Sequence, residues 1–169
     1  SFGDFLATGS EQDIAARMDT VRTDDLSDIL FTSGTTGDPK GAMTTHAQSL
    51  QAYGDWARVV GLKAEDRYLV VAPFFHCFGY KAGWLAAFLK GATVLPQPVF
   101  DPVAVLQRIE PDQVSVLPGP PALYQTLLSK DWQSADLSSL RLAVTGAATI
   151  PVQLIHDMRD KLGFTTVIT

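Results

Sequence analysis

Residues 31 to 41 of this 169-residue chain read Phe31-Thr32-Ser33-Gly34-Thr35-Thr36-Gly37-Asp38-Pro39-Lys40-Gly41. The stretch follows an apolar run typical of a β-strand and contains three glycines, four hydroxyl side chains and a lysine. Glycines let backbone N–H groups converge on an anion, hydroxyls donate hydrogen bonds, and lysine supplies a compact positive charge. The stretch therefore predicts a loop that binds a polyphosphate. A Ser/Thr/Gly surface turn is the alternative interpretation, because turns favour the same residues.

The loop does not follow the Walker pattern of kinases and GTPases. That pattern needs glycine, four residues, and then Gly-Lys-Ser/Thr at the start of a helix. Counting from Gly34, Pro39 stands where the second glycine is required, and Gly41 follows the lysine in place of a hydroxyl residue. A helix is expected to begin only after Thr45. We therefore predict that the loop joins two extended segments and belongs to another class of phosphate-binding loop.

Apolar β-rich runs alternate with amphipathic stretches along the rest of the chain. Strands are predicted at residues 29–31, 68–72, 93–95, 114–117, 142–144 and 167–168. Helices are predicted at 13–18, after a Thr45/Gln48 capping box, at 122–128 and after Pro151. This alternation predicts an α/β fold with a largely parallel sheet and with ligands at the carboxyl ends of the strands. Residues 1–26 are interpreted as a connecting segment, and residues 27–169 as a strand-helix core that carries the loop.

Composition limits the class of partner. The formal net charge is -5 and the lysines and arginines form no cluster, so we expect no nucleic-acid partner. No apolar run reaches the length of a membrane span. The single cysteine, Cys77, is expected to be a small buried hydrophobic residue, and its lack of a disulfide partner favours a cytoplasmic location.

Three blocks of the sequence resemble the adenylate-forming superfamily, which includes acyl-CoA synthetases, peptide-synthetase adenylation domains and luciferases. The stretch from Thr32 to Gly41 resembles the signature loop of that family, and the resemblance extends through most of the chain from about Asp25 onward. The second block looks like the family's aromatic-His segment and reads Pro73-Phe74-Phe75-His76-Cys77-Phe78-Gly79. The third reads Thr145-Gly146-Ala147-Ala148, where Gly-Gly-Ala is common in the family. Together the blocks look like actinobacterial ligases that activate steroid-degradation acids.

The resemblance implies the chemistry of an acid-thiol ligase. A small-molecule carboxylic acid and ATP would form an acyl-adenylate, and coenzyme A as co-substrate would take the acyl group as a thioester. ATP and Mg²⁺ are the implied cofactors, with no metal-ligating residues in the chain itself. An acyl-AMP ligase or a peptide-synthetase adenylation domain, and a non-catalytic nucleotide-binding module, are the alternatives.

The resemblance also implies the residues of the site. ATP phosphate contacts are expected from Thr32, Ser33, Gly34, Thr35, Thr36, Gly37 and Lys40. Adenine contacts are expected from Gly146, Ala147 and Ala148. Acyl-substrate contacts are expected from His76, Phe78, Gly79 and Lys81, with His76 as the catalytic or orienting group beside the carboxylate.

The second block has two interpretations that the sequence leaves open. Its aromatic residues, together with Tyr80 and Trp84, could wall an apolar substrate cavity. They could equally form a core around an inert, hydrogen-bonded His76. Lys81 could contact a polar group of the substrate or extend its ammonium to solvent.

Both ends of the chain suggest a truncated part of a larger adenylation domain. The chain starts without an initiator Met and stops after the strand-like run at 166–168. We expect such a fragment to be inactive alone, because the family's glutamate-bearing segment and lid lysine are absent from the sequence. We also expect it to self-associate through exposed sheet edges.

Overall fold

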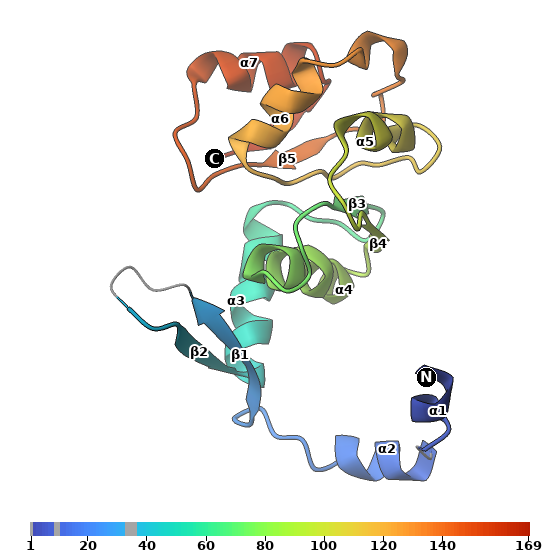
Figure 1. Cartoon of the computed structure of the whole chain (residues 1–169), viewed down its shortest axis with the longest axis vertical. Helices are drawn as coiled ribbons and strands as arrows, with labels where there is room; N and C mark the ends of the chain where they lie inside the picture. Colours follow the sequence, from blue (N-terminus) through green and yellow to red (C-terminus); the bar gives the residue numbers. More distant parts are fainter. Residues whose placement is uncertain (1, 9–10, 33–36) are drawn as a thin grey trace. The chain divides into compact units, whose positions relative to one another are not determined.

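The computed structural model describes residues 2–8, 11–32 and 37–169 and divides into two compact units, Ser1–Leu50 and Gln51–Thr169. Figure 1 gives the order of the elements in both. The first unit contains α1 (Phe2–Leu6), α2 (Glu11–Met18), β1 (Leu26–Thr32), β2 (Lys40–Thr45) and the start of α3 (His46–Val59). The α2 helix confirms the short helix expected near residues 13–18, whereas α1 was not predicted.

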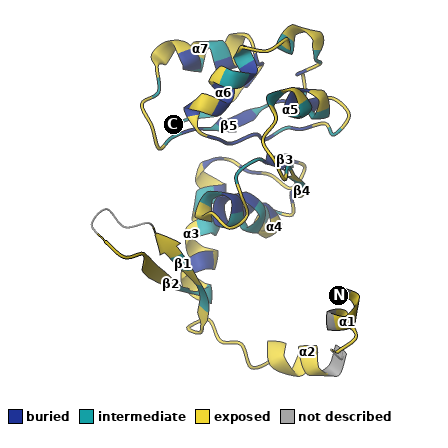
Figure 2. Ribbon diagram, viewed as in Figure 1, coloured by how far each residue is buried: buried dark blue, intermediate teal, exposed yellow. Residues whose placement is uncertain are grey.

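Strands β1 and β2 form an antiparallel pair, which is the exception to the predicted parallel sheet. Their register sets Thr32 opposite Lys40 and Phe31 opposite Gly41. The prediction that the loop joins two extended segments is therefore confirmed. Figure 2 shows that this pair is mostly exposed.

Helix α3 begins with the capping box expected from the sequence. The Thr45 N–H donates to Gln48 Oε1 at 3.0 Å, and the Gln48 N–H donates to Thr45 Oγ1 at 3.3 Å. Each bond satisfies a donor that the first turn of a helix leaves open. Ala57 and Val60, at the carboxyl end of this helix, are buried, whereas Leu50 is exposed.

The second unit contains a parallel sheet with helices packed on both of its faces. Its elements are β3 (Arg67–Val70), η1 (Phe78–Leu85, a π-helix), α4 (Ala86–Lys90), β4 (Thr93–Pro96), α5 (Pro102–Ile109), α6 (Pro121–Leu128), η2 (Trp132–Ser134, a 3-10 helix), β5 (Leu142–Val144), α7 (Val152–Asp160) and β6 (Thr166–Ile168). Parallel pairing joins β3 to β4 and β5 to β6, and bridges from Val116 join β3 to β5. The strand order is therefore β4, β3, the 114–117 segment, β5, β6.

The 114–117 segment occupies the centre of the sheet without forming a regular strand of its own. The Leu69 N–H donates to the Val116 carbonyl at 2.9 Å, and the Leu117 N–H donates to the Leu142 carbonyl at 3.1 Å. Pro118 then interrupts the ladder, because proline has no N–H to donate. Among the described strands, β4 and β6 pair on one side only. Self-association through such edges stays a prediction.

Side chains of the strands alternate between two hydrophobic cores, one on each face of the sheet. Helices α5, α6 and α7 pack over one face, against Leu69 and Ala143. Helix α4 and the later turns of α3 pack over the other, against Tyr68, Val70 and Leu142. Figure 2 shows the buried strands between these helices. This arrangement confirms the predicted α/β class and brings loops together at the carboxyl ends of the strands.

Candidate functional site

One group of predicted site residues lies at the mouth of the β1–β2 pair, within the first unit. The Thr32 hydroxyl donates to the Lys40 carbonyl at 3.4 Å, and the Lys40 side chain is exposed. Gly37 has φ +151°, a conformation that other residues rarely adopt. The structure thus brings Thr32, Gly37 and Lys40 to one end of the pair. The remaining predicted phosphate contacts, Ser33, Gly34, Thr35 and Thr36, lie outside the described residues.

A second group of predicted site residues lies in the second unit, in a tight turn at the carboxyl end of β3. The His76 N–H donates to the Pro73 carbonyl at 3.0 Å, and the Tyr80 N–H donates to the His76 carbonyl at 2.9 Å. The Nδ1 atom of His76 accepts from the Phe78 N–H at 3.1 Å. An accepting Nδ1 puts the proton of the neutral ring on Nε2, which can then donate to a ligand.

One of the two open interpretations of this turn, and the expectation for Cys77, were wrong. His76 is exposed, which contradicts the inert core histidine. Cys77 is also exposed, with its Sγ 4.0 Å from Nδ1 of His76, where a buried hydrophobic residue was expected. The turn folds back on its own backbone, so both side chains stay outside the core.

Gly79 fixes the turn against the end of β3. A Cβ atom at this position would lie 2.3 Å from the Pro73 carbonyl oxygen and 2.4 Å from that of Ala72. Both neighbours are backbone atoms that cannot give way easily. The predicted acyl-site residue Gly79 is therefore buried and required by a close approach of two backbone segments.

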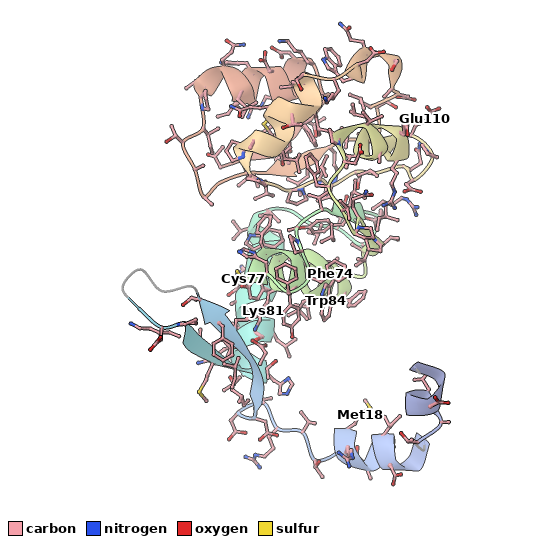
Figure 3. The ribbon with its side chains drawn as sticks, in the orientation of Figure 1. Met18, Phe74, Cys77, Lys81, Trp84 and Glu110 are labelled. Atoms are coloured by element: carbon pink, nitrogen blue, oxygen red, sulfur yellow. The ribbon has the colours of Figure 1, made fainter. Side chains whose placement is uncertain are left out.

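Lys81 is only 2% exposed. The interpretation in which its ammonium extends to solvent is therefore wrong. Its Nζ lies over the ring of Tyr80, 5.5 Å from the ring centroid. Tyr80 in turn stacks on Trp84, with the centroids 4.8 Å apart. Figure 3 shows Phe74, Lys81 and Trp84 around the same helical segment. Phe78, the other predicted acyl-site residue, begins this segment and is half-buried.

An open apolar groove of about 690 Å³ lies along these aromatic residues. Its lining is Phe74, Tyr80, Trp84, Phe88, Val94 and Pro96. Three of the aromatic residues in and after the second block, Phe74, Tyr80 and Trp84, line this groove, whereas Phe78 does not and Phe75 points out at 86% exposure. The sequence interpretation missed Phe88, Val94 and Pro96. The four-residue spacing of Trp84 and Phe88 could have identified Phe88, because residues at this spacing lie on one face of a helix. Val94 and Pro96 lie on β4 and reach the groove only through strand pairing.

The third part of the site follows β5. Around Gly146 a Cβ would meet no described atom within 4 Å, so this backbone faces open space. Ala147 has φ +63°, a left-handed conformation, and Ala147 and Ala148 are exposed. Such a turn presents backbone with little side-chain bulk, as a flat purine would require. The Thr145 hydroxyl is buried and has no hydrogen-bond partner among the described residues.

Tyr124 ties the third part of the site to the centre of the sheet. Its hydroxyl donates to the Leu117 carbonyl at 2.7 Å and lies 3.3 Å from the Val144 carbonyl. The Gly119 N–H donates to the same Val144 carbonyl at 3.0 Å. Burial raises the pKa of the Tyr124 hydroxyl, which therefore stays a neutral donor. The sequence interpretation did not single out Tyr124.

Strand order explains which parts the structure brings together. The chain leaves β3 toward β4 on one side and returns to the 114–117 segment on the other side of β3. The connection after β3 and the connection after the 114–117 segment therefore run to opposite sides from neighbouring positions in the sheet. The carboxyl ends of two such neighbouring positions are where α/β sheets commonly bind ligands. The His76 turn, the residues after Leu117 and the Thr145 block all leave this end of the sheet. The phosphate loop belongs to the other unit.

Two further observations concern the described residues as a whole. No group of three or more His, Cys, Asp or Glu side chains among them is placed to hold a metal ion. No helix among them combines the length and the apolar character needed to cross a bilayer.

The chain is similar to a family of nucleotide-using enzymes and to ligases within it. The sequence profile described as AMP-binding enzyme matches residues 3–169. The 3-[(3aS,4S,7aS)-7a-methyl-1,5-dioxo-octahydro-1H-inden-4-yl]propanoyl:CoA ligase of Mycobacterium tuberculosis is 50% identical, over 100% of this chain and 34% of its own length. The ligase of the same name from Rhodococcus jostii is 46% identical, over 99% of this chain and 33% of its own. The chain thus spans about a third of the length of these relatives.

Solved structures of similar fold are also ligases. An anthranilate CoA ligase in complex with anthranoyl-AMP has a TM-score of 0.78 at 29% identity, over 86% of this chain and 29% of the other. The O-succinylbenzoate CoA synthetase of Bacillus subtilis in complex with AMP has a TM-score of 0.75 at 26% identity, over 87% and 30%.

Proposed function

The chain belongs to the AMP-binding enzyme family, and from this membership we propose that the full-length protein is an ATP-dependent carboxylate–CoA ligase. A carboxylate oxygen attacks the α-phosphorus of ATP, and pyrophosphate leaves. The sulfur of CoA then attacks the acyl carbon of the adenylate, a C–S bond forms, and AMP leaves. The protein's task in such chemistry is to position the groups and to stabilise charge.

The observation that carries this proposal is the geometry at the mouth of the β1–β2 pair. Thr32 and Lys40 end two paired strands, so the donor-rich stretch between them is held at both ends. We assign the β- and γ-phosphates to this stretch, with Lys40 as the cation and Thr32 as a hydroxyl donor. Gly37 supports the assignment because its φ of +151° suits a backbone that turns its N–H groups toward an anion.

We assign the reacting carboxylate to His76. Its Nδ1 is engaged by the Phe78 N–H, so its Nε2–H is the free donor. A hydrogen bond from Nε2 would orient one carboxylate oxygen toward the phosphorus without requiring a charged imidazole. The acyl body would extend past Phe78 and Gly79 toward Lys81 and the apolar groove.

We assign the adenine ring to Gly146, Ala147 and Ala148, whose exposed backbone leaves room for a flat ligand. A Mg²⁺ ion would enter on the ATP phosphates, because magnesium keeps several waters and commonly binds through substrate phosphates. We place the reaction in the cytoplasm.

For the acid, the names of the two actinobacterial relatives support a propanoate that bears a bicyclic diketone. We propose that this protein activates an acid of that type. An apolar ring system of that size fits an open groove walled by aromatic side chains.

Two assays of the full-length protein test the function. Acid-dependent exchange of labelled pyrophosphate into ATP measures adenylation, and thioester formation with CoA measures the second step. We expect both, with a bicyclic keto acid preferred over octanoate. Exchange without thioester would favour an acyl-AMP ligase or a peptide-synthetase domain, and nucleotide binding without exchange would favour a non-catalytic module.

A further inference from the structure

The central 114–117 segment leaves β3 before it leaves β5. Val116 makes the bridge to β3, and Pro118, the next residue in register, has no N–H to donate to that strand. On the other side, the Gly119 N–H still donates to the Val144 carbonyl at 3.0 Å. The ladder with β3 therefore stops at Pro118, whereas the attachment to β5 continues through Gly119.

The hydroxyl of Tyr124 lies at this continuation. It donates to the Leu117 carbonyl at 2.7 Å and lies 3.3 Å from the Val144 carbonyl. These two residues stand directly before Pro118 and Thr145, respectively. One hydroxyl group therefore contacts the ends of two neighbouring segments at the point where both leave the sheet.

Tyr124 is itself firmly held. The residue is buried, and its ring packs edge-to-face on Phe164 with the centroids 5.9 Å apart. Phe164 precedes β6, and the Ile168 carbonyl of β6 accepts from the Thr145 N–H at 2.9 Å. The start of the Thr145 block is thus bonded to β6 on one side and linked through Val144 to Tyr124 on the other.

We propose that Tyr124 is a positioning residue for the nucleotide, whose hydroxyl fixes the direction in which residues 146–148 leave β5 and thereby the selectivity for adenine. The inference rests on the ligase function proposed above and deepens it, because adenine is assigned to these residues. Ala147 supports it, since a left-handed alanine (φ +63°) persists only where the surrounding structure fixes it. Because Tyr124 is buried, it acts through the Leu117 and Val144 carbonyls and not by contact with the ligand.

The purine selectivity of the full-length protein tests this role. The probes are ATP and ITP, which differ at the 6 position of the purine, where ATP carries an amino donor and ITP an oxo acceptor. A backbone group of fixed direction can pair with one of the two but not with both. The readout is the ratio of their kcat/KM values for pyrophosphate release at a saturating concentration of the acid. This ratio does not depend on the fraction of folded enzyme.

We expect the wild type to prefer ATP by roughly 10-fold or more, because polar groups that the wrong ligand leaves unpaired are costly. Tyr124→Phe keeps the ring against Phe164 and removes only the hydroxyl. It should lower the ratio by roughly 3- to 10-fold, the range of one hydrogen bond. The KM for ATP should rise with little change in kcat, as expected when binding is lost equally from the ground state and the transition state.

Tyr68→Phe is the matched control. Tyr68 is also buried, and its hydroxyl also donates to a backbone carbonyl, that of Ala82 at 3.1 Å. This change should leave the ratio unchanged, because the carbonyl it releases belongs to η1 and not to β5. If Tyr124→Phe does not accumulate as folded protein, Phe164→Leu decides. That variant keeps the hydroxyl but removes the ring that holds it, so it should lower the ratio as well.

Four results would overturn the inference. A wild type that uses ATP and ITP equally well removes it. An unchanged ratio in folded Tyr124→Phe, or in Phe164→Leu where Tyr124→Phe does not fold, assigns the hydroxyl to the fold alone. An equal fall of the ratio in Tyr68→Phe shows that the effect is not particular to Tyr124. These three results leave the ligase function intact, whereas a lack of pyrophosphate release with any acid overturns that function as well.

Discussion

Arg141 holds Asp66 with two hydrogen bonds at the amino ends of β5 and β3. Its Nε donates to Asp66 Oδ1 at 2.7 Å, and its Nη2 donates to Oδ2. The Lys63 N–H and the Ser115 hydroxyl donate to the same carboxylate at 2.7 and 2.8 Å. The amino ends of three adjacent sheet positions are thereby joined, at the opposite end of the sheet from the candidate site.

Asp66→Asn should destabilise the protein by about 3 kcal/mol, because it breaks a pair in which the carboxylate is buried. Urea unfolding of the full-length protein, followed by tryptophan fluorescence, measures the change. Asp24→Asn is the matched control, since its ion pair with Arg22 is exposed and should contribute little. Equal effects of the two substitutions would contradict the assigned role.

Asp66 also predicts how stability changes with pH. Burial raises the pKa of this carboxyl, but the hydrogen bonds from Arg141, Lys63 and Ser115 outweigh it, and the net pKa lies below the ordinary 3.8. The stabilisation is therefore complete above the unfolded-state pKa and is lost as the pH falls through the lower folded-state value. As the pH falls from about 5 to about 2, the unfolding midpoint should therefore drop more steeply for the wild type than for Asp66→Asn.

Gly79→Ala should cost about 2 kcal/mol or more, because its Cβ would collide with two backbone carbonyls. Gly54→Ala in α3 is the control, since no described atom lies within 4 Å of its Cβ. That change should stabilise the helix by about 0.5–1 kcal/mol. Thermal unfolding should show a lower melting temperature for Gly79→Ala and a higher one for Gly54→Ala.

Ala147→Gly should be neutral or stabilising by up to about 1 kcal/mol, since a left-handed residue other than glycine is strained. Ala148 does not have a left-handed conformation, so Ala148→Gly relieves no strain. This change should lower the free energy of unfolding, because glycine loses more backbone entropy on folding than alanine does. A loss of stability in Ala147→Gly equal to that in Ala148→Gly would show that the strain is absent.

Lys40→Ala should lower kcat/KM for ATP by roughly 10- to 100-fold, as expected for a lost charged contact to phosphate. The melting temperature should not change, because Lys40 is exposed at the end of β2. Lys130→Ala removes another exposed lysine and should leave ATP use unchanged. Normal ATP kinetics in Lys40→Ala would remove the loop from the mechanism.

His76→Ala should lower kcat/KM for the acid by roughly 10-fold or more while leaving the KM for ATP unchanged. The exposed ring contributes little to the core, so the melting temperature should shift little. Phe75→Ala, at a neighbouring exposed side chain, is the control and should retain activity. A large drop in melting temperature with normal activity per folded molecule would instead assign His76 to the fold.

The sequence predicted the fold well where local rules decide it. The Thr45 capping box, the helix after Pro151 and the strands at 142–144 and 167–168 all follow from caps and apolar periodicity. The π-helix at 78–85 could not be predicted in this way, because its packing depends on how Gly79 meets the end of β3. Burial of Lys81 was missed for the same reason.

The candidate site was predictable in its blocks but not in its contacts. The residue order reveals that His76 lies among aromatic residues, but not that its Nδ1 is engaged by the Phe78 N–H. Exposure of Cys77 likewise depends on a turn that only the folded backbone defines. Tyr124 was missed because its hydroxyl contacts both the 114–117 segment and β5, which lie apart in the sequence.

The strand order also has a kinetic consequence. The central contact between Arg67 and Ser115 joins residues 48 positions apart, and the contact between Arg141 and Asp66 joins residues 75 positions apart. Loop-closure entropy must be overcome before either contact can form. During synthesis, β3 and β4 can pair as soon as both are made, but the sheet cannot close at Asp66 until Arg141 has emerged. Folding of the second unit is therefore expected to finish late, with α4 and β4 ordered before α7.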